Sequence, residues 1–408
     1  MSVEVVNFGC RLNIAEGEAI RTAAAGRNNL IIINSCAVTA EAERQARQAI
    51  RKLKRERPEA EIIVTGCAAE TSPDGFAAMA EVSAVLPNAA KRDRSAYLPF
   101  ANELPVTPAI SGADHARAFV EVQNGCDHDC TFCVTTLARG ASRSVPAGAV
   151  LAAIEQAVAR GQQEVILTGV DLTSYGADLP GQPSLGLLVE RILAHVPGLA
   201  RLRLSSLDSI EVDERLFELI TGEARVMPHV HLSLQSGDDM ILKRMKRRHV
   251  RADAVRLVER LKAARPDIAI GADIITGFPT ESEEMFANSL SLLDACDIVF
   301  GHIFPYSPRA GTAAARMPQL GRAVAKARAD ILRSAVAARK SRWLETLIGT
   351  HQPVLVELDG RTGHAPNHAS VEILAGQDFR AGTDALRGRI MSAFITASTG
   401  DRLLGEIA

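Results

Sequence analysis

The chain has 408 residues, 47% of them hydrophobic, and a formal net charge of −2. This length and composition predict a globular protein of two or three domains. No segment approaches the roughly 20 apolar residues of a membrane-spanning helix. The amino terminus also lacks the basic-then-apolar pattern of a signal peptide, so we predict a cytoplasmic protein without a membrane partner. The near-zero charge excludes a uniformly basic nucleic-acid-binding protein, so any basic surface must be local.

The first 98 residues contain three similar units, each a β-branched apolar run that leads into a cysteine. Such runs predict buried parallel strands, and helical patterns follow them, most clearly over residues 40–57 behind a Thr39 N-cap. Because the carboxyl ends of parallel strands line one crevice, we expect the three cysteines to meet and bind a cluster through three protein ligands. The alternative is that each is an ordinary small buried residue. The runs and their cysteines are residues 3–9 with Cys10, 30–35 with Cys36 and 61–66 with Cys67.

A compact cysteine motif follows the next predicted strand, residues 118–122. Cys126, Cys130 and Cys133 have the spacing C-x3-C-x2-C, which lets three thiolates converge on one soft metal centre. Three ligands would leave one iron of a four-iron cluster open. The alternatives are a zinc knuckle completed by His128, or three buried free cysteines. Seven cysteines in a reducing compartment favour metal or redox chemistry over a disulfide framework.

A linker is predicted over residues 99–118, which are rich in Pro and Gly and show little periodicity. From residue 118 to about 320, strand-like and helical segments alternate, with the clearest helices at 147–160 and 252–264. Six such βα units predict a partial, open relative of the TIM barrel, with its active site at the carboxyl ends of the strands. The predicted strands are residues 118–122, 164–167, 202–204, 230–234, 268–275 and 298–304.

Small and polar residues follow several of these strands. Thr168 and Gly169 come after the second strand, Ser205 after the third, and Gln235 and Ser236 after the fourth. Together they suit a polar ligand of dinucleotide size, although small residues also form ordinary turns between strands and helices.

Basic residues are concentrated in two segments. Residues 243–248 contain five cations in six positions, and residues 319–343 contain seven cations and one acid. We predict that these segments contact phosphate groups, through Lys243, Arg244, Lys246 and Arg247 in the first. The alternative is a solvated helix face.

The last part of the chain, residues 349–408, loses helical periodicity and predicts a small antiparallel β-barrel. It carries five basic and seven acidic residues, so we do not expect it to bind RNA by charge. Turns are predicted at Asp359-Gly360 and Thr399-Gly400. The predicted strands are residues 353–358, 369–374, 389–397 and 403–407.

Taken in order, these motifs resemble the radical S-adenosylmethionine (SAM) methylthiotransferases over nearly the whole chain. The resemblance is carried by residues 7–13, 34–39 and 64–68, by the C-x3-C-x2-C motif, and by residues 139–140 and 142–144. Two departures are a first helix that ends early, near residues 23–26, and residues 134–138, where relatives tend to carry a proline and an aromatic residue. The resemblance implies an iron–sulfur domain at 1–98, a radical-SAM domain with a partial (βα)6 barrel at 112–345, and a TRAM-like β-barrel at 346–408.

The resemblance also implies the cofactors, which are two 4Fe–4S clusters and SAM. The cluster on the C-x3-C-x2-C cysteines would reduce SAM to methionine and a 5′-deoxyadenosyl radical, which removes hydrogen from an unreactive C–H bond. The cluster on the three amino-terminal cysteines would hold the sulfur that a second SAM methylates. The resemblance implies that Thr168 and Gly169 contact SAM, and Phe132 fits the family pattern. We expect Ser205, Gln235 and Ser236 to contact SAM because each follows a strand end.

Within this family, residues 8–13 and 302–312 are most similar to the branch that acts on N6-threonylcarbamoyladenosine (t6A) at position 37 of tRNA. This implies a tRNA anticodon loop as partner, an electron donor such as flavodoxin or ferredoxin, and a monomeric enzyme. Arg309 is a candidate for binding the threonylcarbamoyl carboxylate, although an arginine after Ser-Pro is often a solvated loop residue. The alternatives are methylthiolation of a ribosomal protein or of isopentenyladenosine tRNA, and a non-catalytic iron–sulfur protein that binds RNA or transfers electrons.

Overall fold

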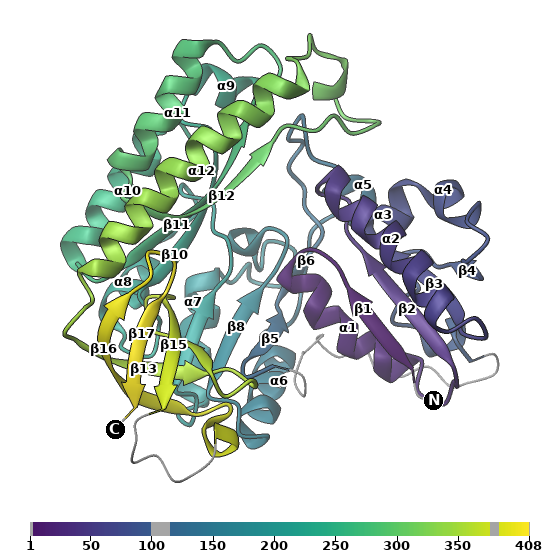
Figure 1. The fold of residues 1–408 in the computed structure, drawn as a ribbon, viewed down its shortest axis with the longest axis horizontal. Helices are drawn as coiled ribbons and strands as arrows, with labels where there is room; N and C mark the ends of the chain where they lie inside the picture. Colours follow the sequence, from purple (N-terminus) through teal and green to yellow (C-terminus); the bar gives the residue numbers. More distant parts are fainter. Residues whose placement is uncertain (1–2, 99–114, 376–382, 408) are drawn as a thin grey trace.

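The computed structural model describes residues 3–98, 115–375 and 383–407, and Figure 1 shows the fold. These residues form an amino-terminal parallel sheet, six central strands in two sheets, and a closed barrel at the carboxyl-terminal end. Most of the predicted linker, residues 99–118, lies outside the described residues. In the part of the chain that the structure describes, no helix combines the length and the apolar character that crossing a membrane requires.

The amino-terminal sheet has the strand order β1-β2-β3-β4, with every neighbouring pair parallel. All residues of β2 are buried, as its continuous apolar sequence predicts. The Thr39 side chain caps the second helix by accepting a hydrogen bond from the Ala42 amide at 3.1 Å. The elements are β1 (Glu4–Asn7), α1 (Arg11–Ala23), β2 (Leu30–Ser35), α2 (Ala40–Glu56), β3 (Glu61–Gly66), α3 (Cys67–Thr71), α4 (Pro73–Ala77), β4 (Ala84–Val85) and η1 (Arg94–Ala96).

The six central strands form two parallel sheets, β5-β8-β9 and β10-β11-β12, linked by a bridge between Leu207 and Leu232. Helices cover the outside of these strands (Figure 1), and one large apolar core lies between the layers. The partial-barrel prediction is confirmed. The strands are β5 (Ala118–Glu121), β8 (Glu164–Thr168), β9 (Arg201–Leu204), β10 (His229–Gln235), β11 (Ala269–Thr276) and β12 (Ile298–Pro305). The helices are α6 (Ala147–Ala159), α7 (Leu185–His195), α8 (Glu214–Gly222), α9 (Asp239–Arg244), α10 (Arg251–Ala264), α11 (Glu283–Ala295) and α12 (Arg322–Glu345).

Short elements that lack a periodic signal complete the central part. The antiparallel pair β6 (Gln123–Asn124) and β7 (Arg143–Ser144) brackets the cysteine motif, and α5 (Thr135–Arg139) follows its last cysteine. Two residues are too few to show an alternating pattern, so the sequence did not predict this pair. The 3-10 turns η2 (Leu172–Ser174) and η3 (Ala314–Arg316) lie in loops after β8 and β12.

The carboxyl-terminal strands form a closed barrel in the order β13-β14-β15-β17-β16. The predicted barrel is confirmed, but it is not wholly antiparallel, because β15 and β17 pair in parallel. The strand β16 lies between β15 and β17 in sequence, but it pairs with β13 and β17 and not with β15. The strand β17 therefore runs beside β15 in the same direction. The strands are β13 (His351–Val356), the unpredicted β14 (Thr362–His364), β15 (Ser370–Ala375), β16 (Ile390–Ser398) and β17 (Leu403–Ile407), with η4 (Thr383–Leu386) before β16.

This barrel packs against the amino-terminal ends of the central strands, at the base of the view in Figure 1. Arg203 of β9 donates to the Pro366 carbonyl at 3.0 Å and to Glu164 at 3.1 Å, and Arg117 forms an ion pair with Glu357 of the barrel. Burial alone would raise the pKa of Glu164, but Arg203 and Arg117 hold it at about 2. The barrel therefore leaves the carboxyl ends of the strands open.

Stability should fall in mild acid because two histidines at this junction, the buried His229 and the half-buried His368, are held in a neutral state. The ring centroids of His229 and His368 lie 4.8 Å apart. Burial lowers the pKa of both below its usual value, and nearby positive charges lower it further. Below the usual histidine pKa of about 6.5, these histidines bind protons in the unfolded chain but not in the folded protein. At one pH unit below that value, each such histidine should therefore lower the free energy of unfolding by up to about 1.4 kcal/mol. The cost is smaller for His368, which is partly exposed.

The measurement is the free energy of unfolding between about pH 7.5 and 5.5. The control is His368→Asn, because asparagine does not titrate and tolerates the positive φ of 71° at this position. The variant should lose less stability in acid than the parent. Identical pH slopes for both proteins would contradict the prediction.

Candidate active site

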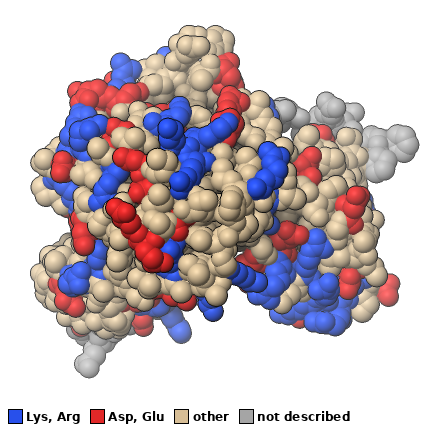
Figure 2. Space-filling view, turned by 90° about the horizontal axis from the view of Figure 1, so that it is seen from above, with Lys and Arg blue, Asp and Glu red and all other residues tan. Residues whose placement is uncertain are grey.

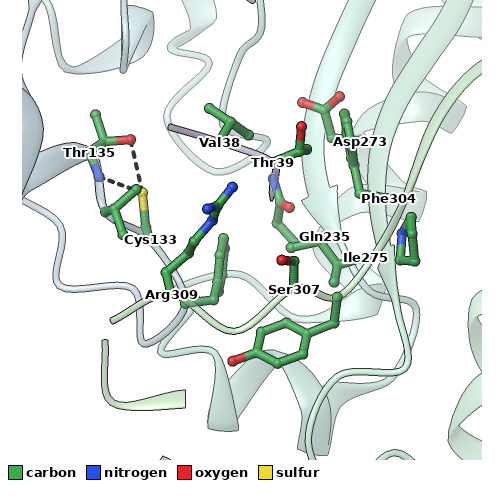
Figure 3. Close-up of a pocket in the computed structure, with 14 residues that line it drawn as sticks. Val38, Thr39, Cys133, Thr135, Gln235, Asp273, Ile275, Phe304, Ser307 and Arg309 are labelled. Atoms are coloured by element: carbon green, nitrogen blue, oxygen red, sulfur yellow. Dashed lines mark hydrogen bonds between the residues drawn. The ribbon is translucent and has the colours of Figure 1, made fainter. Parts of the chain in front are cut away.

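A cavity of about 210 Å³ lies at the carboxyl ends of β10, β11 and β12. Its lining combines Thr39, from the loop before α2, with Cys133 from the cysteine motif. Gln235 at the end of β10 and Asp273 of β11 complete this part of the wall. Figure 3 shows these four side chains around one space. The amino-terminal sheet and the central strands therefore share the site.

The C-x3-C-x2-C cysteines lie close together in the loop between β6 and β7. Burial, together with the nearby thiols of Cys130 and Cys133, raises the pKa of Cys126 to about 12, so the three thiols are electrostatic neighbours. Gly125, with φ of 73°, begins the loop, and a Cβ there would stand 2.0 Å from the Ala141 carbonyl oxygen. Only glycine therefore fits this turn.

Polar hydrogens point at these sulfurs. The His128 amide donates to Cys126 Sγ at 3.4 Å and the Thr135 amide donates to Cys133 Sγ at 3.3 Å. Arg247 Nη1 lies 3.7 Å from Cys130 Sγ. Such donors stabilise thiolates and cluster sulfurs. Three thiols with these donors fit an iron–sulfur cluster.

The His128 side chain is paired with a carboxylate. His128 Nε2 lies 2.7 Å from Asp171 Oδ2 and 3.0 Å from Arg248 Nη2. The ligand atoms of Cys126, His128 and Asp171 lie within 4.8 Å of one another, which is the spacing of a metal group, and His231, Asp273 and His302 have the same spacing. The first trio does not contain Cys130 or Cys133, which the zinc-knuckle alternative requires.

Cys10, Cys36 and Cys67 follow the ends of the adjacent parallel strands β1, β2 and β3. Burial, together with the nearby thiols of Cys10 and Cys67, raises the pKa of Cys36 to about 11. A Cβ on Gly9 would stand 2.5 Å from Cys36 Sγ, so glycine here lets the first strand end approach the second. All seven cysteines are free thiols. This second set also offers three sulfurs at one sheet edge.

A buried charge network lies beside Cys67. Arg139 donates from Nε to Cys67 Sγ at 3.1 Å, and Glu16 accepts from Arg139 at 2.9 Å and from Lys91 at 2.7 Å. Burial alone would raise the pKa of Glu16, but Lys91 and Arg139 hold it well below its usual range. A second cavity, of about 520 Å³, adjoins these groups. Residue 139 belonged to a family motif, but no sequence pattern predicted its partners.

Of the six residues expected to contact SAM, the structure places Phe132 and Gln235 in the cavity lining. Ser236 is buried and its hydroxyl lies 3.3 Å from that of Ser289, so it packs between β10 and α11. Gly169 approaches Gln123 closely, since a Cβ there would stand 2.9 Å from Oε1. Thr168, Gly169, Ser205 and Ser236 are outside the lining of this cavity.

Arg309, in the loop after β12, extends between Cys133 and Thr39 in Figure 3. Its Nη1 lies 3.5 Å from Glu43 Oε2 of α2. Its Nε and Nη2 are buried and have no hydrogen-bond partner among the described residues. Unpaired buried guanidinium nitrogens are costly, so they indicate a missing acceptor.

Sequence reasoning missed a row of three polar residues on β10, β11 and β12. His231 Nε2 and His302 Nδ1 lie 3.0 and 3.1 Å from the same oxygen of Asp273. The two hydrogen bonds lower the pKa of Asp273 far below its usual range, against the effect of burial. Asp273 thus presents a fixed negative charge to the cavity. Polar residues inside otherwise apolar strands were the available signal.

Fewer basic side chains in the two basic segments are unpaired than their sequence indicates. The Arg247 side chain is only 9% exposed and its Nη2 lies 2.9 Å from Asp208 Oδ2, so its charge is paired within the protein. Lys246 pairs with Asp129 of the cysteine loop and remains exposed. In α12, four of the seven cations pair with acids distant in sequence or within the helix, namely Arg328, Arg333, Arg339 and Lys340. Figure 2 shows basic and acidic side chains interspersed over most of one face.

Comparisons with known proteins extend over nearly the whole chain. Residues 120–293 match the radical SAM superfamily, and residues 2–87 match the Uncharacterized protein family UPF0004. Two relatives are named threonylcarbamoyladenosine tRNA methylthiotransferase MtaB. The one from Rickettsia prowazekii is 46% identical, with 93% of this chain and 94% of the relative covered. The one from Thermotoga maritima is 34% identical, with 87% and 86% covered.

A third relative, the tRNA-2-methylthio-N(6)-dimethylallyladenosine synthase of Ruegeria pomeroyi, is 30% identical, with 99% of this chain and 98% of the relative covered. A structure of the radical SAM methyltransferase TsrM from Kitasatospora setae aligns with a TM-score of 0.50 at 16% identity, covers 73% of this chain and 66% of that chain, and supports the fold. From these matches, the chain belongs to the radical-SAM methylthiotransferases, enzymes that use SAM and 4Fe–4S chemistry.

Proposed function

We propose that this enzyme adds a methylthio group to carbon 2 of t6A at position 37 of tRNA. The proposal includes two 4Fe–4S clusters, one on Cys126, Cys130 and Cys133 and the other on the amino-terminal cysteines. The relatives named for threonylcarbamoyladenosine support the substrate. The observation that carries it is Arg309, whose buried Nε and Nη2 have no partner among the described residues.

Arg309 suits the chemical group that distinguishes t6A from other modified adenosines. The threonylcarbamoyl group ends in a carboxylate, and a guanidinium binds a carboxylate through two parallel N–H donors. Arg309 lines the same cavity as Cys133, so a carboxylate bound to it would lie beside the radical-SAM loop. An isopentenyl group is apolar and would leave Arg309 unpaired in a buried site, which disfavours that alternative.

The remaining site residues bind and orient. When bound, SAM and a reduced cluster supply the one-electron chemistry that breaks an unreactive C–H bond. Phe132 and Gln235 would contact SAM or substrate from the cavity wall. The edge-to-face packing of Phe132 on Phe278, with centroids 6.5 Å apart, holds the cysteine loop against the loop that follows β11. Asp273, fixed by two imidazoles, would accept a hydrogen bond from a donor of the bound ligand.

The same proposal extends to partners and location. The anticodon loop would enter between the amino-terminal sheet and the central strands, where both line the cavity. A flavodoxin- or ferredoxin-type donor would reduce the enzyme, which we propose acts as a monomer in the cytoplasm. The free thiols of the chain suit that reducing compartment.

The Lys243–Lys246 turn should contribute to tRNA binding by charge. The cysteine loop packs against it, because the Thr131 side chain donates to the Arg244 carbonyl at 2.8 Å. Replacing Lys243, Arg244 and Lys246 with alanine should weaken tRNA binding by about 1 kcal/mol per lost phosphate contact. The slope of the logarithm of the binding constant against the logarithm of the salt concentration should also become shallower by about 1 per lost contact. SAM cleavage without tRNA should stay at the parent level.

The measurement is tRNA affinity over a range of salt concentrations. A matched control replaces three exposed cations of α2, Arg51, Lys52 and Arg55, with alanine. It should change affinity little. If both triple variants lose affinity equally, binding reflects overall charge, and the turn is not a specific contact surface.

The proposed function is tested by mass spectrometry of tRNA nucleosides from a strain that lacks this gene. The strain should accumulate t6A and lose its 2-methylthio derivative, and the parent gene should restore it, whereas a Cys126→Ala gene should not. Loss of a methylthiolated isopentenyladenosine, with methylthiolated t6A retained, would overturn the proposed substrate.

A further inference from the structure

We propose that Arg139 is a positioning residue that tunes the amino-terminal cluster and fixes it relative to the radical-SAM cysteine loop. This rests on the proposed function, because it requires a cluster on Cys10, Cys36 and Cys67. The primary observation is the hydrogen bond from Arg139 Nε to Cys67 Sγ, 3.1 Å long. Arg139 lies at the end of α5, the helix that begins just after Cys133.

The Arg139 guanidinium has no freedom to turn. Nη1 donates to Glu16 and Asn124, both at 2.9 Å, and Nη2 donates to Asn13 at 2.6 Å and to Glu16 at 3.0 Å. With the bond to Cys67, these contacts account for all five N–H groups of an arginine side chain. The direction of the Nε–H bond toward the sulfur is therefore set by the surrounding protein.

The partners of Arg139 come from both halves of the site. Asn13 and Glu16 lie on α1, which begins directly after Cys10, and Asn124 lies on β6, just before the loop that holds Cys126. Arg139 is 7% exposed, so these bonds are shielded from water. One side chain thus ties the segments that flank the two cysteine sets, which fixes their spacing more firmly than either segment could alone.

The network also leaves positive charge beside the sulfur. Glu16 and Glu121 pair with Lys91, Arg92 and Arg139, so three cations face two carboxylates. A positive charge and an N–H donor at a ligand sulfur stabilise the more negative, reduced state of a cluster. Arg139 should therefore raise the reduction potential of the amino-terminal cluster.

A purely structural role for Arg139 would need only its ion pair with Glu16, whereas tuning of the cluster needs its hydrogen bond to Cys67. The variant Arg139→Lys separates these two roles. Lysine keeps the charge but has no Nε–H directed at Cys67. In the holoenzyme with both clusters, redox titration should show a lower midpoint for the amino-terminal cluster and an unchanged midpoint for the other. In enzyme without a bound sulfur to methylate, SAM identifies the radical-SAM cluster, because only that cluster's spectrum should change when SAM is added.

The matched control is Arg143→Lys. Arg143 lies in the same segment, but its guanidinium donates to the carbonyls of Ala141 and Arg139 and not to a sulfur. Neither midpoint should move in this variant. Unchanged midpoints in Arg139→Lys as well would overturn the proposed role.

A second measurement on the parent protein does not depend on the folding of a variant. Holoenzyme grown with arginine labelled with ¹⁵N in the guanidinium should show ¹⁵N hyperfine coupling to the cluster whose spectrum does not respond to SAM. The longer Arg247–Cys130 approach, 3.7 Å, should give weaker coupling to the other cluster. Absence of coupling to the SAM-insensitive cluster overturns the role of Arg139. An iron content of about four per chain would instead overturn the two-cluster function itself.

Discussion

Cys10→Ala protein should still cleave SAM to 5′-deoxyadenosine but should form no methylthiolated tRNA, whereas Cys126→Ala protein should do neither. The reason is the separation of the cysteines into two sets of three at two different places, the sheet edge after β1–β3 and the loop between β6 and β7. Loss of one ligand should empty one cluster and leave the other. Iron should fall from about eight to about four per chain in each variant.

Both products are measured in one anaerobic reaction by mass spectrometry. The matched control is Cys296→Ala, the same chemical change at a buried thiol at the end of α11. It should leave both products and the iron content at parent levels. Equal loss of both products in Cys10→Ala protein would show that the amino-terminal set is not a separate sulfur-handling site.

The second large effect should come from Arg309→Ala. Removing the guanidinium leaves the substrate carboxylate without its partner in a site shielded from water, which costs about 2 kcal/mol or roughly a 30-fold loss in kcat/KM. The loss should appear with tRNA that carries t6A. With tRNA that carries unmodified adenosine at position 37, parent and variant should be equally poor, because no carboxylate is present.

Two controls separate carboxylate binding from packing. Glu43→Gln removes the ion pair of Arg309 with α2 but keeps the guanidinium, so preference for t6A should remain. Arg316→Ala removes an exposed arginine from the same loop and should change nothing. If Glu43→Gln abolishes the preference as fully as Arg309→Ala, then Arg309 acts by joining the two domains and not by binding substrate.

The fold could be predicted wherever the local pattern was long enough. Six apolar runs became the six central strands, and Thr39 caps α2 as expected. Strands of two or three residues, such as β6 and β14, carry too little pattern to detect. The parallel pairing of β15 with β17 depends on how the barrel closes, which no local segment encodes.

The candidate site shows the same division. Two groups of cysteines could be predicted from local sequence. One group follows the ends of three predicted strands, and the other forms one short motif. The number of unpaired cations on α12 was overestimated, because some of their acid partners lie outside the helix. Arg339, for example, pairs with Asp294 and Asp297. Arg139 was missed as a link between the groups because its partner Glu16 lies 123 positions away in sequence. Such contacts arise only once the chain has folded.

The zinc-knuckle and non-catalytic alternatives for the chain do not survive the comparisons. Its cysteine motif lies in a region that matches the radical SAM superfamily. The relatives that match this chain over most of their length are named as enzymes. For the choice among substrates we rely instead on the cavity, where we propose that Arg309 binds the carboxylate of t6A.

The most direct test of the account is one anaerobic reaction with reconstituted enzyme, SAM, a reductant and two preparations of the same tRNA, with and without t6A at position 37. Mass spectrometry of the digested nucleosides should show 2-methylthio-t6A from the first preparation and no methylthiolated adenosine from the second. Methylthiolation of both preparations at equal rates, or of isopentenyladenosine tRNA in preference to t6A tRNA, would contradict the account.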